Sequence, residues 1–202
     1  MHTSNTIKEL TMQTVNKQCQ LAYDHRLAFH VLNSNQKKDL LQCISQAIID
    51  QQEAIINANR KDIDKGTQNG LTTALIDRLT LNEERIEGIA HSILEIASLP
   101  DPIGDILEEW ERPNGLKIKK IRVPLGVVGM IYEARPNVTA DAIAIGIKTG
   151  NAMVLRGSAS AYDSNKAIVS VVKANITATT ATKEVNCFKY LNIYPLLYLF
   201  IC

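Results

Sequence analysis

Two short clusters of polar residues, at 133–137 and 156–158, lie in an otherwise apolar part of the chain and could do chemistry. The side chains in them that could bind or polarise a ligand are Glu133, Arg135, Asn137, Arg156 and Ser158. A guanidinium group offers a planar fork of donors that suits a phosphate or a carboxylate. The alternative is that these residues only cap helices and satisfy turns.

The elements that must position these residues form a strand–helix–strand pattern. The apolar run Leu125–Tyr132 predicts a buried strand, Val138–Thr149 predicts an almost wholly apolar helix that ends at Gly150-Asn151, and Ala152–Leu155 predicts a second strand. In such a parallel unit, ligands bind beyond the carboxyl ends of the strands. We therefore expect both polar clusters at the same edge of the sheet, where they could share a ligand.

The residues before this unit predict an array of amphipathic helices. Helical periodicity covers residues 6–32, 34 to about 58, 71–79, and a segment introduced by the capping-box pattern at 80–83. Ser34 is the expected N-cap of the second of these helices. Another helix is expected at 159–172, after the second polar cluster.

A β-hairpin is predicted between the helical array and the apolar unit. Ile106–Arg112 and Leu116–Val123 flank Asn114-Gly115, a strong hairpin-turn signal. The lysines of its second arm form either a solvated face or a nucleotide-binding patch. An isolated hairpin is marginally stable, so self-association is physically reasonable.

The composition excludes several classes of protein. The 202 residues include 22 Lys and Arg against 21 Asp and Glu, which argues against charge-driven binding to nucleic acid or a membrane surface. The four cysteines show no metal-ligand spacing, the start lacks the apolar core of a signal peptide, and the apolar end, 190–202, is too short to span a bilayer. The expected location is the cytoplasm, and no metal is expected.

The motifs VPLGVVGMIYEARPNVT and KTGNAMVLRGS closely resemble the gamma-glutamyl phosphate reductase (glutamate-5-semialdehyde dehydrogenase) family of the aldehyde dehydrogenase superfamily. The resemblance extends over about Thr6 to Val172. It implies an α/β fold: residues 1–172, including hairpin 105–123, would be the amino-terminal part of an NADP-binding domain with a parallel sheet and flanking helices. Residues 173–202 would be a divergent tail outside the fold, arising from a frameshift or early stop, or alternatively a genuine lineage-specific tail.

The resemblance also implies a reaction, the NADPH-dependent reduction of gamma-glutamyl phosphate in proline biosynthesis. A cysteine thiolate displaces phosphate, and hydride then releases the semialdehyde from the resulting thioester. Asn137 is the candidate amide donor to the carbonyl oxygen, or else a helix cap. Arg135 would bind the acyl phosphate or the substrate carboxylate, or else form a structural ion pair with Glu133 or another acid.

The cofactor site implied by the resemblance is the trio Arg156, Gly157 and Ser158. An arginine there suits the extra phosphate of NADP, and Gly157 would let the cofactor approach the backbone. No G-x-G-x-x-G pattern accompanies it.

The family's nucleophilic cysteine is expected to be absent from this chain, because it lies well downstream of the LRG motif. Cys19 and Cys43 are expected to be buried packing residues, and Cys187 and Cys202 match no family motif. The chain alone is therefore expected to be inactive, and full-length relatives are expected to be homo-oligomers that use the hairpin. The alternative is a non-enzymatic remnant or interaction module that keeps only part of the cofactor fold.

Overall fold

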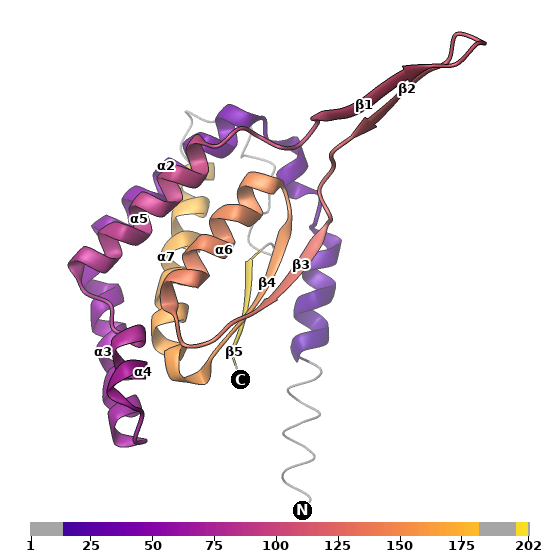
Figure 1. The fold of residues 1–202 in the computed structure, drawn as a ribbon. Coiled ribbons are helices and arrows are strands. Elements are labelled where there is room, and N and C mark those ends of the chain that lie inside the picture. Colours follow the sequence, from indigo (N-terminus) through magenta and orange to yellow (C-terminus); the bar gives the residue numbers. More distant parts are fainter. Residues whose placement is uncertain (1–13, 182–196, 202) are drawn as a thin grey trace, which may run out of the picture.

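The computed structural model describes residues 14–181 and 197–201. It shows a three-stranded parallel sheet, helices packed against it, and a separate two-stranded hairpin (Figure 1). The predicted α/β fold class is confirmed. A helix covers residues 14–24, and the elements after it are η1 (Ala28–Val31), α2 (Ser34–Asp50), α3 (Gln52–Gln68), α4 (Thr73–Leu79), α5 (Glu83–Ser98), β1 (Ile106–Glu111), β2 (Lys117–Ile121), β3 (Val127–Ile131), α6 (Pro136–Thr149), β4 (Ala152–Gly157), η2 (Ala159–Ala161), α7 (Tyr162–Ala181) and β5 (Leu197–Ile201).

The centre of the fold is the predicted strand–helix–strand unit. Strands β3 and β4 pair in parallel, from Val127 opposite Ala152 to Ile131 opposite Arg156. Helix α6 crosses between them on one face of the sheet (Figure 1). The unit is therefore confirmed. The first polar cluster follows the carboxyl end of β3, whereas Arg156 and Gly157 of the second are the last residues of β4.

Local signals fix both ends of α6. The helix begins two residues earlier than expected because Pro136 occupies its first position, where a missing amide hydrogen has little cost. It ends at Gly150, whose φ of 69° lies in the left-handed region that glycine adopts readily. The side-chain oxygen of Asn151 accepts a hydrogen bond from the amide of Gly126 at 2.9 Å, which ties the starts of β3 and β4 together.

The last described segments extend this unit. Helix α7 runs to Ala181, beyond the expected end at residue 172. Strand β5 pairs in parallel with β4, with Leu197 opposite Met153. The division of the chain at residue 172 stays a prediction, since 182–196 and 202, with Cys187 and Cys202, lie outside the described residues.

The amino-terminal helices differ from the prediction in their boundaries. The single helix expected from residue 34 to about 58 is two helices, separated at Gln51, and no side-chain cap marks the break. Asn33 rather than Ser34 is the N-cap of α2. Its side chain accepts from the amide of Gln36 at 2.9 Å, and the Gln36 side chain accepts from the amide of Asn33 at 2.9 Å.

The start of α5 is likewise shifted. Asn82 is its N-cap, with Oδ1 accepting from the amide of Arg85 at 2.8 Å. The capping box predicted at 80–83, with Thr80 as cap, is therefore wrong. A second capping-competent side chain two residues along the chain takes the role.

Helices α2, α3, α5, α6 and α7 form two layers on one side of the sheet (Figure 1). Helices α6 and α7 pack against the strands, and α2, α3 and α5 pack against α6 and α7 from outside (Figure 1). Their shared core is mainly aliphatic, and its largest fully buried side chains are Phe29, Leu40, Leu41, Ile44, Ile48, Ile55, Leu79, Ile86, Ile93, Ile143 and Ile147.

A buried lysine joins α6 to the end of α5. Lys148 is 4% exposed, and its Nζ donates to the carbonyl oxygen of Ala97 at 2.9 Å. The last carbonyls of a helix lack partners within the helix, so the ammonium group closes α5. Burial lowers the pKa of Lys148 because desolvation disfavours its charged form, although the nearby Asp101 carboxylate acts in the opposite direction.

The hairpin projects away from the rest of the fold (Figure 1). Its strands pair antiparallel, and Gly115 makes the turn with a φ of 81°. Every residue of β1 is exposed, and Lys120 and Lys119 of β2 pair across the strands with carboxylates of β1 at 2.7 and 3.2 Å. The lysines thus belong to a solvated face, on which Lys119 and Lys120 are neutralised, in agreement with the first of the two interpretations.

Two kinds of feature are missing from the described residues. No helix among them is both long and apolar enough to cross a bilayer. Nor do they contain a group of three or more His, Cys, Asp or Glu that could hold a metal ion.

Glycine-to-alanine substitutions in two helices should have opposite effects on stability. A Cβ at Gly146 of α6 would collide with the side chain of Met153 on β4, so Gly146→Ala should lower the free energy of unfolding by about 1–3 kcal/mol. A Cβ at Gly88 of α5 would meet nothing within 4 Å, so Gly88→Ala should raise it by up to about 1 kcal/mol. Urea unfolding of the whole chain measures both. Equal effects would show that the close contact between α6 and β4 is wrong.

Candidate functional site

The loop after β3 places the first polar cluster at the start of α6. The hydrogen bonds between β3 and β4 continue one residue past β3, because the amide of Tyr132 donates to the carbonyl oxygen of Arg156 at 3.1 Å. A tight turn follows, in which the amide of Arg135 donates to the carbonyl oxygen of Glu133 at 2.8 Å. Arg135 is the N-cap residue of α6 without a side-chain cap hydrogen bond. Asn137 is therefore in the first turn and does not cap the helix, so the capping alternative is wrong.

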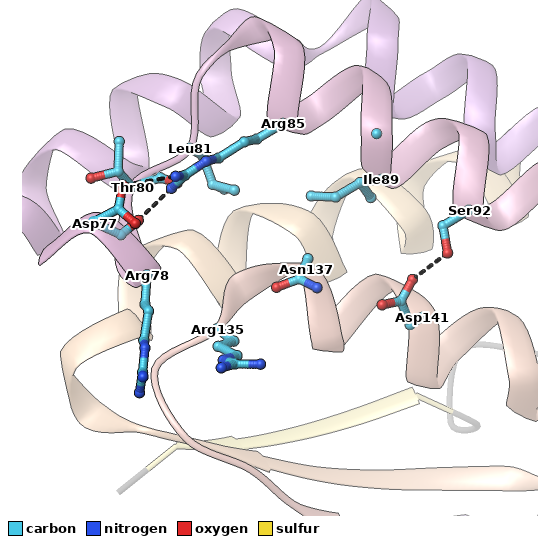
Figure 2. A pocket seen from close by; sticks show the side chains of 11 residues that line it. Asp77, Arg78, Thr80, Leu81, Arg85, Ile89, Ser92, Arg135, Asn137 and Asp141 are labelled. Carbon is cyan, nitrogen blue, oxygen red and sulfur yellow. Dashed lines mark hydrogen bonds and ion pairs between the residues drawn. The ribbon is translucent and has the colours of Figure 1, made fainter. Parts of the chain in front are cut away.

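A cavity of about 480 Å³ brings Arg135 and Asn137 together (Figure 2). Its walls come from α4, from the loop to α5, and from α5 and α6. We call it the α6 cavity, and its lining residues are Asp77, Arg78, Thr80, Leu81, Arg85, Gly88, Ile89, Ser92, Arg135, Asn137 and Asp141.

Two arginines of the α6 cavity have side chains free to bind an anion. Arg78 and Arg135 are exposed, and neither makes an ion pair within the part of the chain that the structure describes. Arg85 differs, because its guanidinium donates to the Asp77 carboxylate at 2.8 Å and to the carbonyl oxygen of Thr80 at 2.8 Å. The alternative, an ion pair between Arg135 and Glu133, is not formed. These two arginines, beside the Asn137 amide, can bind a phosphate or carboxylate.

An acidic side chain lies at the other end of the same cavity. Asp141 follows Asn137 by four residues, so both lie on one face of α6. Its Oδ1 accepts a hydrogen bond from Ser92 Oγ of α5 at 2.9 Å (Figure 2). Asp141 was not predicted from the sequence, although its spacing from Asn137 places the two on one face of a helix. Arg78 was not predicted either, because only the tertiary packing of α4 brings it to the cavity.

A fully buried asparagine holds the wall that carries Arg78. Asn59 of α3 donates from Nδ2 to the carbonyl oxygen of Leu79 at 2.8 Å and to Ser164 Oγ at 2.9 Å. Its Oδ1 accepts from the amide of Leu81 at 2.8 Å. One side chain thus fixes the backbone on both sides of Thr80 and links it to α7.

A second buried network holds the start of α6. The Tyr132 hydroxyl and Thr139 Oγ1 are 2.6 Å apart, and Thr139 Oγ1 donates to Asn165 Oδ1 of α7 at 2.8 Å. Burial raises the pKa of the Tyr132 hydroxyl, and the hydrogen bond to Thr139 partly offsets this effect. The network connects the end of β3, α6 and α7, and so it orients the turn that carries Arg135.

The second polar cluster does not join the α6 cavity. A Cβ at Gly157 would collide with Asn165 Nδ2 of α7, so position 157 faces the helices. Side chains alternate along a strand, so Arg156 points to the opposite face of the sheet, and it is exposed there. The expectation that Arg156 and Asn137 share a ligand is therefore wrong. Gly157 has a packing reason to be glycine, and the Ser158 hydroxyl accepts from the amide of Ser160 at 3.3 Å.

Neither described cysteine lines the α6 cavity. Cys19 and Cys43 are both exposed, so the expectation that they pack in the core is wrong. On α2 the neighbouring Leu41 and Ile44 occupy the buried face, which leaves Cys43 on the solvent side.

Comparisons with known proteins agree with the motifs. No protein-family model matches the chain. Two curated proteins named gamma-glutamyl phosphate reductase are similar to it: that of Geobacillus sp. strain WCH70 is 57% identical over 143 residues, and that of Geobacillus thermodenitrificans is 53% identical over 154 residues. These matches cover 71% and 76% of the chain. The resemblance to gamma-glutamyl phosphate reductase is confirmed.

The matched chain is short relative to these proteins. It spans 35% and 37% of the length of the two curated gamma-glutamyl phosphate reductases.

Solved structures of gamma-glutamyl phosphate reductase share the fold. The enzyme from Thermotoga maritima aligns with a TM-score of 0.79 and 29% identity, over 89% of this chain and 44% of that chain. The one from Saccharomyces cerevisiae aligns with a TM-score of 0.79 and 27% identity, over 91% and 46%. An acetylating aldehyde dehydrogenase from Geobacillus thermoglucosidasius, at 14% identity and a TM-score of 0.60, shares the fold over 96% of this chain and 37% of that chain.

Removing the buried asparagine should destabilise the fold far more than removing an exposed one from the same helix. Asn59→Ala would leave the carbonyl of Leu79 and the amide of Leu81 without partners, so it should lower the free energy of unfolding by roughly 2–3 kcal/mol. The matched control is Asn57→Ala, which removes one exposed hydrogen bond to Arg60 and should stay within about 0.5 kcal/mol of the native value. Urea unfolding distinguishes them, and similar losses would refute the bridging role.

Proposed function

We propose that this chain is part of a gamma-glutamyl phosphate reductase, an NADPH-dependent enzyme of proline biosynthesis that acts in the cytoplasm. It would supply the residues that bind the phosphate of the substrate and the first strands of the cofactor-binding sheet. The observation that carries the proposal is the α6 cavity, where Arg135 and Asn137 of the YEARPNVT motif lie beside Arg78. The substrate, gamma-glutamyl phosphate, is an acyl phosphate, and its phosphate group matches this pair of guanidinium groups.

Within this reaction Arg135 would bind the phosphate that departs when the thiolate attacks. The Asn137 side-chain amide would donate a hydrogen bond to the carbonyl oxygen, on which negative charge builds during attack and again during reduction. Such a donor contributes most when it is held in place beforehand, and the buried Tyr132–Thr139–Asn165 network supplies that rigidity. NADPH, when bound, supplies the hydride.

The thiol nucleophile would be supplied by a residue other than those that line the α6 cavity here. Neither Cys19 nor Cys43 lines the cavity. The resemblance places the thiol downstream of the LRG motif. We therefore expect ligand binding by this chain without turnover.

The proposed cofactor contact is Arg156, on the face of the sheet away from α6. Its guanidinium is exposed and makes no ion pair with any described residue, so it is free to bind the extra phosphate of NADPH. Gly157 and Ser158 shape the turn behind it.

The projecting hairpin supports self-association of the complete enzyme. Its exposed apolar side chains include Trp110, Ile106 and Ile121, and a hairpin with both faces in water is only marginally stable. A second copy is the proposed partner.

Phosphate binding tests the substrate site. Arg135→Gln should raise the dissociation constant for inorganic phosphate about tenfold or more, because one charge-assisted hydrogen-bonding group is lost. Titration calorimetry of the whole chain at constant ionic strength measures this change. The matched control is Arg112→Gln at the exposed end of the hairpin, which should bind phosphate as the native chain does. Equal affinities for the three proteins would reject the site and favour the non-enzymatic alternative.

Cofactor titration tests the second site. The native chain should bind NADPH more tightly than NADH, and Arg156→Gln should reduce that preference by about tenfold while leaving NADH binding unchanged. Quenching or enhancement of the nicotinamide fluorescence follows binding. A chain that binds neither nucleotide, or an Arg156→Gln variant with the native preference, would contradict the assignment.

A further inference from the structure

The α6 cavity has opposite charges at its two ends. Figure 2 shows Arg78 and Arg135 toward one end and Asp141 toward the other, with Asn137 between them. An anion site alone would need only the arginine end. The carboxylate indicates that the ligand also carries a second polar group, at its other end.

The Asp141 carboxylate has no cationic partner within the described residues. Its Oδ1 accepts from the neutral hydroxyl of Ser92, and the side chain is half-buried. Arg85, which lines the same cavity, pairs with Asp77, and Lys148, two turns farther along α6, donates to a carbonyl of α5. A carboxylate held in a cavity without an ion-pair partner is suited to a cation brought by a ligand.

The spacing of Arg135 and Asp141 is comparable to the length of an extended glutamyl phosphate. Arg135, the N-cap of α6, precedes Asp141 by six residues, so the axial rise between their Cα atoms is about 9 Å at 1.5 Å per residue. In an extended glutamyl phosphate, six bonds separate the phosphorus from the α-nitrogen, a span of about 7–8 Å. Asn137, one turn before Asp141, then lies beside the reacting carbonyl rather than beside either end.

We propose that Asp141 binds the α-ammonium group of the amino-acid substrate, with its phosphate at Arg78 and Arg135. This inference rests on the proposed function and adds to it a basis for substrate choice. The Ser92 hydroxyl occupies Oδ1 and fixes the carboxylate, which leaves Oδ2 for the ammonium group. A dicarboxylic compound of the same length without the amino group would leave the carboxylate unpaired, and the cavity selects against it.

Ligand pairs that differ only in the amino group test the assignment. L-glutamate and glutarate have the same five-carbon chain and two carboxylates, and both can place one carboxylate at the arginines. The native chain should bind L-glutamate about tenfold more tightly than glutarate, as measured by NMR titration of the whole chain at constant ionic strength. Asp141→Asn, which keeps the shape of the side chain, should lose this preference without weakening glutarate.

The matched control is Asp64→Asn, which removes an exposed carboxylate from α3 outside the cavity and should keep the native preference. Equal native affinities for the two ligands, or an Asp141→Asn variant that still prefers L-glutamate, would overturn the inference. If phosphate binds but the preference is absent, only the role of Asp141 fails. If neither phosphate nor glutarate binds, the proposed function fails with it.

Discussion

The burial of α6 between the sheet and the outer helices is the constraint on which the rest of this structure depends. The helix contacts β4 below it, α7 beside it, and α2 and α5 above it. A helix enclosed on so many sides must be apolar almost all round, and its remaining polar groups need partners inside the protein. Those partners supply the organisation of the site. Thr139 joins the Tyr132–Asn165 network, Lys148 closes the end of α5, and the first turns of the helix face the α6 cavity.

The same constraint explains why the site could be predicted in part. Strand, helix and strand were readable because the apolar runs are short, uninterrupted and separated by turn residues. The motif placed Arg135 and Asn137 after β3, and the structure puts both in the α6 cavity. Asp141 lies at a spacing that helical geometry relates to Asn137. Arg78 could not be found in this way, because it reaches the cavity through the packing of α4, which no local pattern encodes.

The failed predictions have equally local causes. The shared ligand of Asn137 and Arg156 was inferred from the edge of the sheet alone, whereas the alternation of side chains along β4 turns Arg156 to the other face. The caps at Ser34 and Thr80 were misassigned because several capping-competent residues stand close together, and tertiary packing decides which one begins the helix. The break at Gln51 has neither proline nor glycine and no side-chain cap, so the apolar periodicity predicted one continuous helix across it.

The buried lysine at the end of α6 has a consequence for the coupling between folding and protons. Desolvation holds the pKa of Lys148 below its ordinary value, so the folded chain binds this proton less tightly than the unfolded chain does. Burial of Lys148 therefore lowers the free energy of unfolding most at pH values below its folded pKa. This penalty shrinks as the pH rises toward the ordinary pKa of a lysine. In that alkaline interval, opening of the layer between α5 and α6 is accompanied by net proton uptake.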